Sequence, residues 1–229
     1  MKTVLVLRLG RAPYGPVLAW QRRLHRLRRE EKIPNILLSL EHEPVVTLGR
    51  SAKTADLLLS EEERERLGVE VYLIERGGAA TYHGPGQLVL YPILNLRTLG
   101  LSLRQYVEGL EKVMIRVGKA LGVELFRRPG YPGAWHELGK VGFVGVHVQG
   151  WVSFHGLALN VNLNPNGFQW IVPCGMADLS VVSLSDLLGR PVEVKEVEPL
   201  ALAAFSEVFG VDLVELSGKE IRTWLNQLG

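Results

Sequence analysis

The sequence predicts one α/β domain spanning residues 1–229, in which a mixed β-sheet is flanked by helices. Segments with helical and strand-like patterns alternate along the chain, which is typical of α/β folds. Two apolar runs are separated only by Gln149-Gly150, a hairpin turn that adds an antiparallel pair to the sheet. No internal repeat, low-complexity tract or Ser/Pro-rich linker breaks the pattern. The weakest boundary is Gly189-Arg190-Pro191, and a mainly helical C-terminal portion is expected from about residue 190.

Helices are predicted where apolar residues recur at helical spacing or where a capping pair opens a segment. The predicted helices are Pro13–Glu31, Ser60–Gly68, Ser102–Gly122, Glu198–Val208 and a last one capped by Ser217 with Glu220. In three of them a serine is followed three residues later by Glu or Gln, so the two side chains can cap each other's backbone amides.

Strands are predicted from short apolar runs, rich in β-branched residues, that end at turn-forming residues. These runs are Thr3–Leu7, Asn35–Leu40, Val69–Ile74, Leu88–Leu96, Val141–Val148 and Trp151–Val161.

Composition places the chain among ordinary globular proteins, with 47% hydrophobic and 22% charged residues. A single cysteine excludes an intramolecular disulfide framework and favours a reducing, cytoplasmic location. The apolar run at the N-terminus is too short for a signal peptide, and no stretch approaches the roughly 18 apolar residues of a membrane span. A net charge of +2 is too small to indicate a nucleic-acid partner.

Five arginines crowd the first predicted helix, namely Arg22, Arg23, Arg26, Arg28 and Arg29. Because the apolar residues of this segment recur at helical spacing, the arginines are interpreted as the solvated face of an amphipathic helix. The alternative is a docking patch for an acidic partner.

The least ordinary stretch of the sequence reads RGGAATYHGPGQLVLYP and begins at Arg76. Its first eleven residues hold four glycines and a proline, so the backbone can take positive φ and approach a ligand closely. The spacing matches neither the Walker pattern nor the dinucleotide fingerprint. A structural hairpin would rarely crowd together Arg76, Thr81, Tyr82, His83 and Gln87. The stretch therefore predicts a snug loop for an apolar or thioester ligand.

Three further segments share this character, namely Gly139-Lys140-Val141-Gly142-Phe143-Val144-Gly145, Ser153-Phe154-His155-Gly156-Leu157-Ala158-Leu159-Asn160 and Val172-Pro173-Cys174-Gly175-Met176. Together with RGGAATYHGPGQ and the following Tyr-Pro, and in this order, they strongly resemble the lipoyl(octanoyl) transferase family, which moves octanoyl groups onto lipoyl-dependent proteins. The likeness continues at Val182-Ser183-Leu184 and spans at least residues 41–190. The main departure is Phe143, where the family usually has a small residue, and it concerns the shape of the acyl pocket.

The resemblance implies the fold of biotin and lipoate ligases, a class II synthetase-like mixed sheet flanked by helices. It also implies that Cys174 accepts the acyl group. Without the resemblance, a lone cysteine is more often a small buried apolar residue. A thiolate suits the chemistry because acyl exchange between thioesters is nearly isoenergetic. The final transfer to an amine runs downhill, so no ATP or other cofactor is expected.

The resemblance makes Lys140 the partner of Cys174, although alone it would pass for a surface lysine that starts a strand. An unperturbed thiol is only a few per cent thiolate at neutral pH, so a nearby cation is needed to favour the charged form. We expect a mutually stabilising Lys140–Cys174 pair in the free enzyme. Acylation then removes the negative charge, and Lys140 takes a proton from the incoming amine.

The resemblance implies substrate contacts from three of the segments. They come from Arg76, Gly77, Gly78, Ala79, Ala80, Thr81, Tyr82, His83, Phe143, Val144, Gly145, Gly156, Leu157 and Ala158. His83 and the supporting residue His155 are expected to position groups or form hydrogen bonds, although a Cys–His pair is a competing arrangement. No metal site is expected, because the spacings of candidate ligands match no recurring motif.

The expected donor is octanoyl-acyl carrier protein, and the expected acceptors are lipoyl domains of 2-oxoacid dehydrogenases and the glycine-cleavage H protein. The nearest alternative is an ATP-dependent lipoate or biotin ligase on the same fold, against which stand the cysteine with its lysine and the GPGQ ending of the first motif. An alternative of a different class is a non-catalytic acyl-carrier or lipid-binding module.

Overall fold

The computed structural model describes residues 2–176, 178–217, 220 and 224. Its strands are β1 (Lys2–Ala12), β2 (Asn35–His42), β3 (Val45–Leu48), β4 (Glu70–Leu73), β5 (Ala80–His83), β6 (Gln87–Ile93), β7 (Phe126–Arg128), β8 (Tyr131–His136), β9 (Gly139–Gln149), β10 (Val152–Asn160) and β11 (Val211–Glu215). Its helices are α1 (Tyr14–Arg29), α2 (Glu61–Leu67), α3 (Leu96–Leu99), α4 (Leu103–Ala120), α5 (Leu184–Leu188) and α6 (Val194–Phe209), with 3₁₀ turns at Thr54–Asp56 and Pro165–Trp170.

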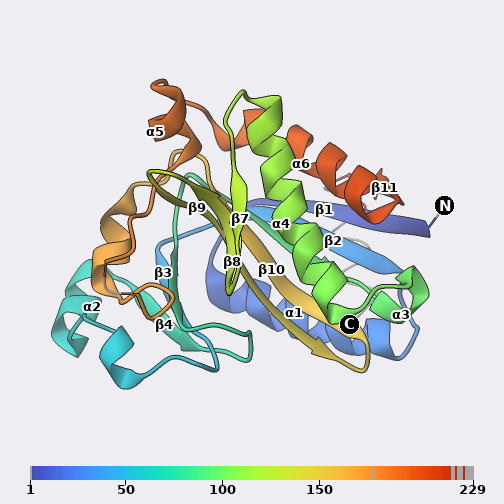
Figure 1. The fold of residues 1–229 in the computed structure, drawn as a ribbon. Helices are drawn as coiled ribbons and strands as arrows, with labels where there is room; N and C mark the ends of the chain where they lie inside the picture. The colour runs from blue at the N-terminus through green and yellow to red at the C-terminus, as the bar shows by residue number, and fades with distance from the viewer. Residues whose placement is uncertain (1, 177, 218–219, 221–223, 225–229) are drawn as a thin grey trace.

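The strands form two sheets (Figure 1). The main sheet has the order β11-β1-β2-β6-β10-β9-β8-β7, and the small sheet has the order β4-β3-β5. In the main sheet β1 pairs in parallel with β11 and β2, whereas the pairs from β2 to β7 are antiparallel. The predicted mixed α/β sheet flanked by helices is therefore confirmed.

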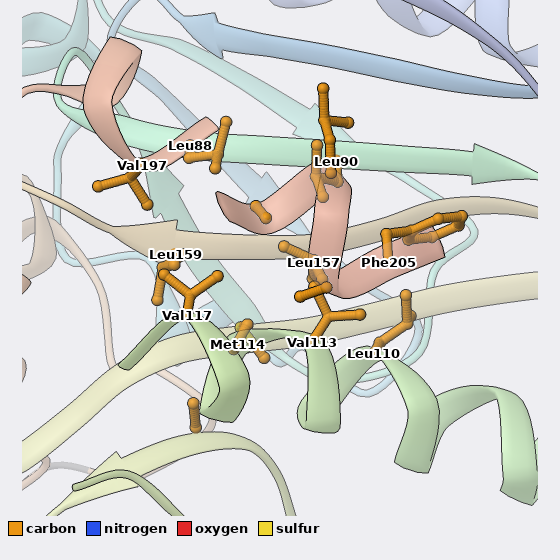
Figure 2. Close-up of a cluster of buried hydrophobic side chains, with 14 of the residues drawn as sticks. Leu88, Leu90, Leu110, Val113, Met114, Val117, Leu157, Leu159, Val197 and Phe205 are labelled. Carbon is orange, nitrogen blue, oxygen red and sulfur yellow. The ribbon is translucent and has the colours of Figure 1, made fainter. Parts of the chain in front are cut away.

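Each face of the main sheet carries its own apolar core. Alternate side chains of β6 and β10 point to opposite faces, because successive residues of a strand do so. Leu88, Leu90, Leu157 and Leu159 meet α4 and α6 on one face, around Val113 and Phe205 (Figure 2). On the other face, Val89, Tyr91 and Ala158 meet α1 through Val17 and Leu24. The central strands are thus covered on both sides, which fixes the strands that carry the site described below.

The predicted hairpin between the last two long strands is present, shifted by one residue. Gln149 pairs with Val152, so the turn consists of Gly150 and Trp151, and both residues have positive φ, at 58° and 65°. This is the backbone of a type I′ turn, whose twist matches that of the flanking strands. The reciprocal caps predicted for α2 and α4 are also present.

Three expectations need correction. The stretch from Arg76 was predicted as a loop, but its residues 80–83 form β5, which pairs with β3. The predicted strand that began at Leu88 ends at Ile93, and Leu96 already starts α3. The portion after residue 190 is mainly helical, yet its strand β11 joins the main sheet beside β1. Ser217 and Glu220 exchange the predicted capping hydrogen bonds, and the rest of that helix lies outside the described residues.

Candidate active site

A pocket of about 370 Å³ collects most of the residues singled out in the sequence. Its walls come from the 76–81 segment, from β9 and β10, and from the turn between β7 and β8. The described residues that line it are Tyr14, Arg76, Gly77, Gly78, Ala79, Ala80, Thr81, His83, Tyr91, Val107, Gly130, Tyr131, Pro132, Lys140, Phe143, Val144, Gly145, Val146, His155, Gly156, Leu157, Ala158 and Cys174.

Lys140 and Cys174 meet at one wall of this pocket. The Nζ of Lys140 lies 3.5 Å from the Sγ of Cys174. Lys140 is only 3% exposed, whereas Cys174 is half-buried. Burial lowers the pKa of the Lys140 amine, and attraction to Cys174 opposes this lowering. Among the described residues, no histidine nitrogen is within hydrogen-bond distance of the Cys174 sulfur, so the geometry favours a Cys–Lys over a Cys–His arrangement.

Backbone pairing brings these two residues together from distant parts of the chain. Pro173 forms a parallel bridge with Ala80, and the Cys174 amide donates to the Ala80 carbonyl at 3.1 Å. Further on, Val181 forms a parallel bridge with Lys140. The segment that carries Cys174 is therefore fixed to β5 of the small sheet at one end and to β9 of the main sheet at the other. Cys174 itself has φ of 56°, a left-handed conformation that is uncommon outside glycine and recurs at functional sites.

Two aromatic rings lie against the Lys140 ammonium. Nζ lies 4.9 Å from the centroid of the Trp135 ring and 4.8 Å from that of the Phe143 ring. Trp135 pairs with Lys140 across β8 and β9, and its indole nitrogen donates to the Tyr131 carbonyl at 3.0 Å. Phe143 stacks on Phe168, with centroids 5.2 Å apart.

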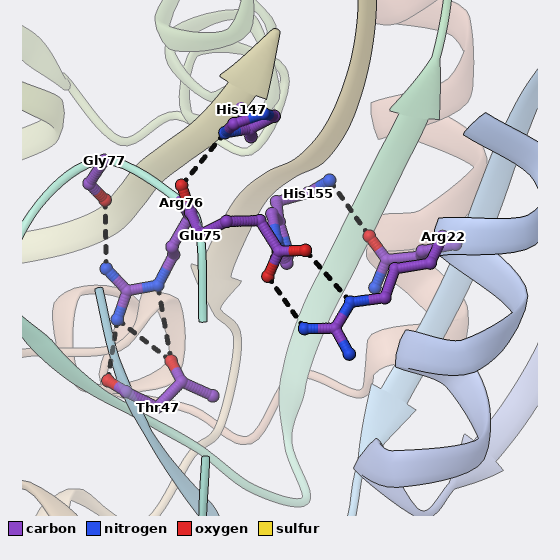
Figure 3. A network of polar contacts seen from close by, with 8 residues as sticks. Arg22, Thr47, Glu75, Arg76, Gly77, His147 and His155 are labelled. Carbon is purple, nitrogen blue, oxygen red and sulfur yellow. Dashed lines mark hydrogen bonds and ion pairs between the residues drawn. The ribbon is translucent and has the colours of Figure 1, made fainter. Parts of the chain in front are cut away.

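Arg76 is a second buried cation on the pocket wall, 7% exposed. Its guanidinium donates to the Thr47 carbonyl at 2.7 Å, to the Thr47 hydroxyl at 2.9 Å and to the Gly77 carbonyl at 3.0 Å (Figure 3). Gly145 leaves room for it, because a Cβ there would lie 2.8 Å from the Arg76 Cδ. Burial lowers the pKa of Arg76, and attraction to Cys174 is among the effects that oppose this.

Burial keeps His83 neutral, and a chain of hydrogen bonds through the motif residues fixes its ring. Its Nδ1 lies 2.7 Å from the Gln87 Oε1, and Gln87 in turn donates from Nε2 to the Asn160 Oδ1 at 2.9 Å. Because the Gln87 oxygen can only accept, His83 carries its proton on Nδ1. Asn160 donates onward to the Val182 carbonyl at 3.1 Å. Burial lowers the pKa of His83 to about 3.

A polar network joins α1 to the pocket wall (Figure 3). Arg22 donates to both oxygens of Glu75, at 2.9 and 3.0 Å. The same carboxylate lies 3.8 Å from the His155 Nε2, while the Glu75 carbonyl accepts from His147 Nδ1 at 3.0 Å. His155 and Arg22 hold the pKa of the Glu75 carboxyl well below its usual value. Glu75 directly precedes Arg76, so this network fixes the start of the wall segment.

The arginines of α1 mostly lie on the predicted solvated face. Arg22, Arg26 and Arg29 are exposed, and Arg22 also donates to Glu75. Arg28 departs from the prediction, because it is buried and donates to the Asn35 Oδ1 at 2.8 Å. The ion pair with Glu75 leaves less of the Arg22 charge available for an acidic partner.

The structure places one predicted contact away from the pocket. Tyr82 lies between Phe168 and Trp170, with ring centroids 5.6 and 5.4 Å away. Within the described part of the chain, every other predicted site residue lines the pocket. The sequence interpretation missed Glu75 and Tyr131, the first residue of β8. Glu75 could have been noticed as an acidic residue directly before the motif.

Two broader properties concern the described residues alone. No group of three or more His, Cys, Asp or Glu side chains is arranged there to hold a metal ion. No helix in that part of the chain is long and apolar enough to cross a bilayer.

Known proteins similar to this chain fall into one group. The lipoyl protein ligase A/B catalytic domain family matches residues 13–206. An octanoyltransferase of Caldicellulosiruptor saccharolyticus is 40% identical over 210 residues, which cover 91% of this chain and 89% of the relative. An octanoyltransferase of Rubrobacter xylanophilus is 44% identical over 203 residues, which cover 88% of this chain and 91% of the relative.

Solved structures show the same fold at low identity. Lipoate-protein ligase A bound with ATP has a TM-score of 0.73 at 16% identity, covering 99% of this chain and 94% of that one. The LipL1 protein of P. falciparum in complex with lipoate has a TM-score of 0.72 at 13% identity, covering 100% and 72%. A biotin protein ligase from Aquifex aeolicus with biotin and ATP reaches 0.51 at 16% identity, covering 92% and 71%. On the identity and coverage of its relatives, the chain belongs to the octanoyltransferase family, within the wider lipoyl protein ligase A/B catalytic domain family.

Proposed function

We propose that this protein is an acyltransferase that moves an octanoyl group from acyl carrier protein, through a Cys174 thioester, to a lysine of a lipoyl domain. The observation that carries the proposal is the 3.5 Å contact between Lys140 Nζ and Cys174 Sγ at the wall of an apolar pocket. Family membership supports the octanoyl group, and the acceptor follows from the lipoyl-dependent proteins that the family resemblance implies.

In the first half-reaction the Cys174 thiolate attacks the carbonyl carbon of the donor thioester. A new carbon–sulfur bond forms to Cys174, and the bond to the carrier sulfur breaks. The carrier thiolate takes the proton of the Lys140 ammonium, so a free thiol leaves and Lys140 becomes a neutral amine. Burial favours that neutral form, because it lowers the pKa of Lys140 and the opposing Cys174 charge is now gone.

In the second half-reaction the neutral ε-amine of the acceptor lysine attacks the Cys174 thioester. Lys140 takes the proton that the attacking nitrogen loses, and Cys174 leaves as a thiolate. The products are an amide and the original ammonium–thiolate pair. The cycle balances in protons and needs no nucleotide, since a thioester is exchanged for a more stable amide.

The pocket suits an acyl chain with a thioester at one end. Leu157, Ala158 and Val144 offer apolar surface, whereas Lys140 and Arg76 place positive charge near the sulfur. Burying about seven carbons at roughly 0.8 kcal/mol each gives an upper figure of about 5–6 kcal/mol, which the costs of association reduce.

The decisive experiment is to incubate the protein with octanoyl-acyl carrier protein and weigh it intact. We expect a covalent octanoyl adduct that is absent in Cys174→Ser and that disappears when a lipoyl domain is added. A parallel reaction with free octanoate and ATP separates transfer from ligation. An adduct that never forms, or modification of the lipoyl domain that requires ATP, would overturn the proposal.

A further inference from the structure

The surroundings of the Lys140 ammonium are unusual for a buried lysine. Within the described residues its hydrogen-bond partner is a sulfur, and no carboxylate forms an ion pair with it. Glu111 attracts it from α4, but that carboxylate accepts from the Gly133 amide at 3.0 Å and from Arg127 Nε at 2.6 Å. Burial disfavours the ammonium and the contact with Cys174 opposes this only in part, since the pKa of Lys140 remains lowered, so a further feature that stabilises the cation is expected.

The two aromatic rings meet this requirement. Both centroids lie within 5 Å of Nζ, inside the roughly 6 Å over which a ring face attracts a cation. The rings are themselves fixed, Trp135 by its hydrogen bond to the Tyr131 carbonyl and Phe143 by its stack on Phe168. Gly133 completes the arrangement, because a Cβ there would lie 2.7 Å from the Cε of Lys140.

We propose that Trp135 and Phe143 are positioning residues that form an aromatic seat for the Lys140 ammonium and hold it against Cys174. The seat rests on the function proposed above, because it acts through the Lys140–Cys174 pair. Phe143 also lines the pocket, so one ring contacts both the lysine and the space assigned to the acyl chain.

The seat has opposite consequences for the two half-reactions. Before acylation it favours the ammonium, and therefore the thiolate beside it. After acylation it still favours the ammonium, and therefore opposes the free amine that acts as the base. Removing one ring should move the pH profile of thiolate formation to higher pH. It should move the pH profile of the second half-reaction to lower pH. From exposed to desolvated sites, a cation–π contact corresponds to about 0.4–1.5 pH units of movement in the Lys140 titration, and the thiolate profile should move by at most that amount.

Other charged groups near the pair stay constant in this comparison. Arg128 lies over the Trp135 ring at 5.0 Å, and Arg76 attracts Cys174 from the wall segment. Glu111 remains bonded to Arg127. For this reason Phe143→Leu is the sharper variant, since among the described residues Lys140 is the cation over this ring and leucine keeps the apolar bulk.

The test is the rate of Cys174 alkylation by iodoacetamide against pH in the free enzyme, which needs neither donor nor acceptor. Phe143→Leu should move the profile to higher pH, whereas Phe143→Tyr, which keeps a ring face, should not. Phe209→Leu is the matched control, because it makes the same substitution in α6, where the ring contacts Tyr106 and Phe205. In a Lys140→Met background, Phe143→Leu should have no further effect on the profile.

Superimposable profiles for the wild type and Phe143→Leu would overturn the seat, and so would an equal movement in Phe209→Leu. The second half-reaction, followed from preformed octanoyl enzyme, should move in the opposite direction, and movement in the same direction contradicts the seat. Failure of the octanoyl adduct to form would count against the proposed function alone, because the alkylation profile is measured without it.

Discussion

Lys140 is a buried cation whose hydrogen-bond partner is a thiol, and this pairing makes its two protonation states useful in turn. Burial lowers the pKa of its amine, and attraction to Cys174 partly restores it. A lysine held between these influences can be an ammonium beside a thiolate and an amine beside a thioester. An arginine in the same place could serve only the first state, because a guanidinium does not deprotonate in proteins.

Lys140→Arg should separate the two half-reactions. Formation of the octanoyl enzyme should persist, since a positive charge still faces the sulfur and the carrier sulfur can leave as a thiolate that takes its proton from water instead of from residue 140. Transfer to the amine should fall by about 10²–10⁴-fold, the usual contribution of a positioned base. Rapid-quench measurements of each step at several pH values give both rates, and Lys140→Met provides the control in which both should fall. Normal transfer to the amine in Lys140→Arg would contradict the base role.

Gly156 lines the pocket, and the packing around it leaves no space for a Cβ. It pairs with Gly145 across β10 and β9, and a Cβ on it would lie 2.1 Å from the Leu90 carbonyl oxygen of β6. Backbone cannot yield as a side-chain end can, so Gly156→Ala should lower the free energy of unfolding by about 1–3 kcal/mol. Urea denaturation measures the change. Gly77→Ala is the matched control, because its nearest neighbour would be 3.6 Å away, and an equal loss in both variants would contradict this account.

At the scale of elements, α1 is tied to the pocket wall through one carboxylate. Arg22 on α1 and His155 on β10 both act on Glu75, which directly precedes Arg76. The wall segment has few side chains of its own to anchor it, since Gly77 and Gly78 follow at once. The network therefore transmits the position of a helix to the residues that shape the site.

Glu75→Gln should show this coupling as a pH-dependent loss of stability. The folded state holds the pKa of this carboxyl below its usual 4.5, so its stabilisation is present above that value. It is lost as pH falls through the lower folded-state value. The difference in unfolding free energy between wild type and Glu75→Gln should therefore be constant from pH 7 to 5 and shrink below about 4.5. Urea denaturation at each pH measures this difference. Glu62→Gln, which changes an exposed residue of α2, is the control.

The helices and strands also differ in how well the sequence predicts them. The caps of α2 and α4 were predictable because Ser60 and Ser102 each act on a residue three positions away. Strands such as β3 and β5 were not, because four-residue strands depend on pairing partners that are distant in sequence. Tyr82 was misplaced for the same reason. Once residues 80–83 are a strand, side chains alternate between its faces.

The candidate site, too, could be predicted from the sequence only in part. Its residue types were readable from motifs and from a family resemblance, whereas the meeting of Lys140 with Cys174 depends on bridges to Val181 and Ala80 that no local pattern encodes. Glu75 and the two rings around Lys140 contribute through contacts between elements. The sequence thus indicated most of the residues that line the pocket and could not supply how they are arranged.

At the scale of the whole molecule, several histidines are buried in neutral form. Burial lowers the pKa of His42 to about 4 and that of His83 to about 3. His42 is held by the Ala12 carbonyl at 3.0 Å and the Tyr91 hydroxyl at 2.9 Å. The unfolded chain takes up these protons near pH 6.5, well before the folded chain does.

Stability should therefore fall as pH drops below about 6.5, and it should continue to fall to about pH 4 for His42. Each such histidine contributes about 1.4 kcal/mol per pH unit in that window. Urea unfolding at intervals of half a pH unit gives the slope of the unfolding free energy against pH. His42→Gln should reduce this slope by the amount that corresponds to one proton. A free energy of unfolding that does not change between pH 6.5 and 5 would contradict the neutral burial of these residues.

The attachment of the Cys174 segment to both sheets also determines when Lys140 and Cys174 can meet during folding. One end pairs with Ala80 of the small sheet and the other with Lys140 of the main sheet, so neither sheet alone can create the pair. On a newly made chain the sulfur therefore cannot contact Lys140 until both sheets have closed around it. Under the proposed mechanism, the reactivity of Cys174 arises only at this late stage of folding. During refolding from denaturant, enhanced alkylation of Cys174 should accordingly appear only after the circular dichroism of the sheets has recovered.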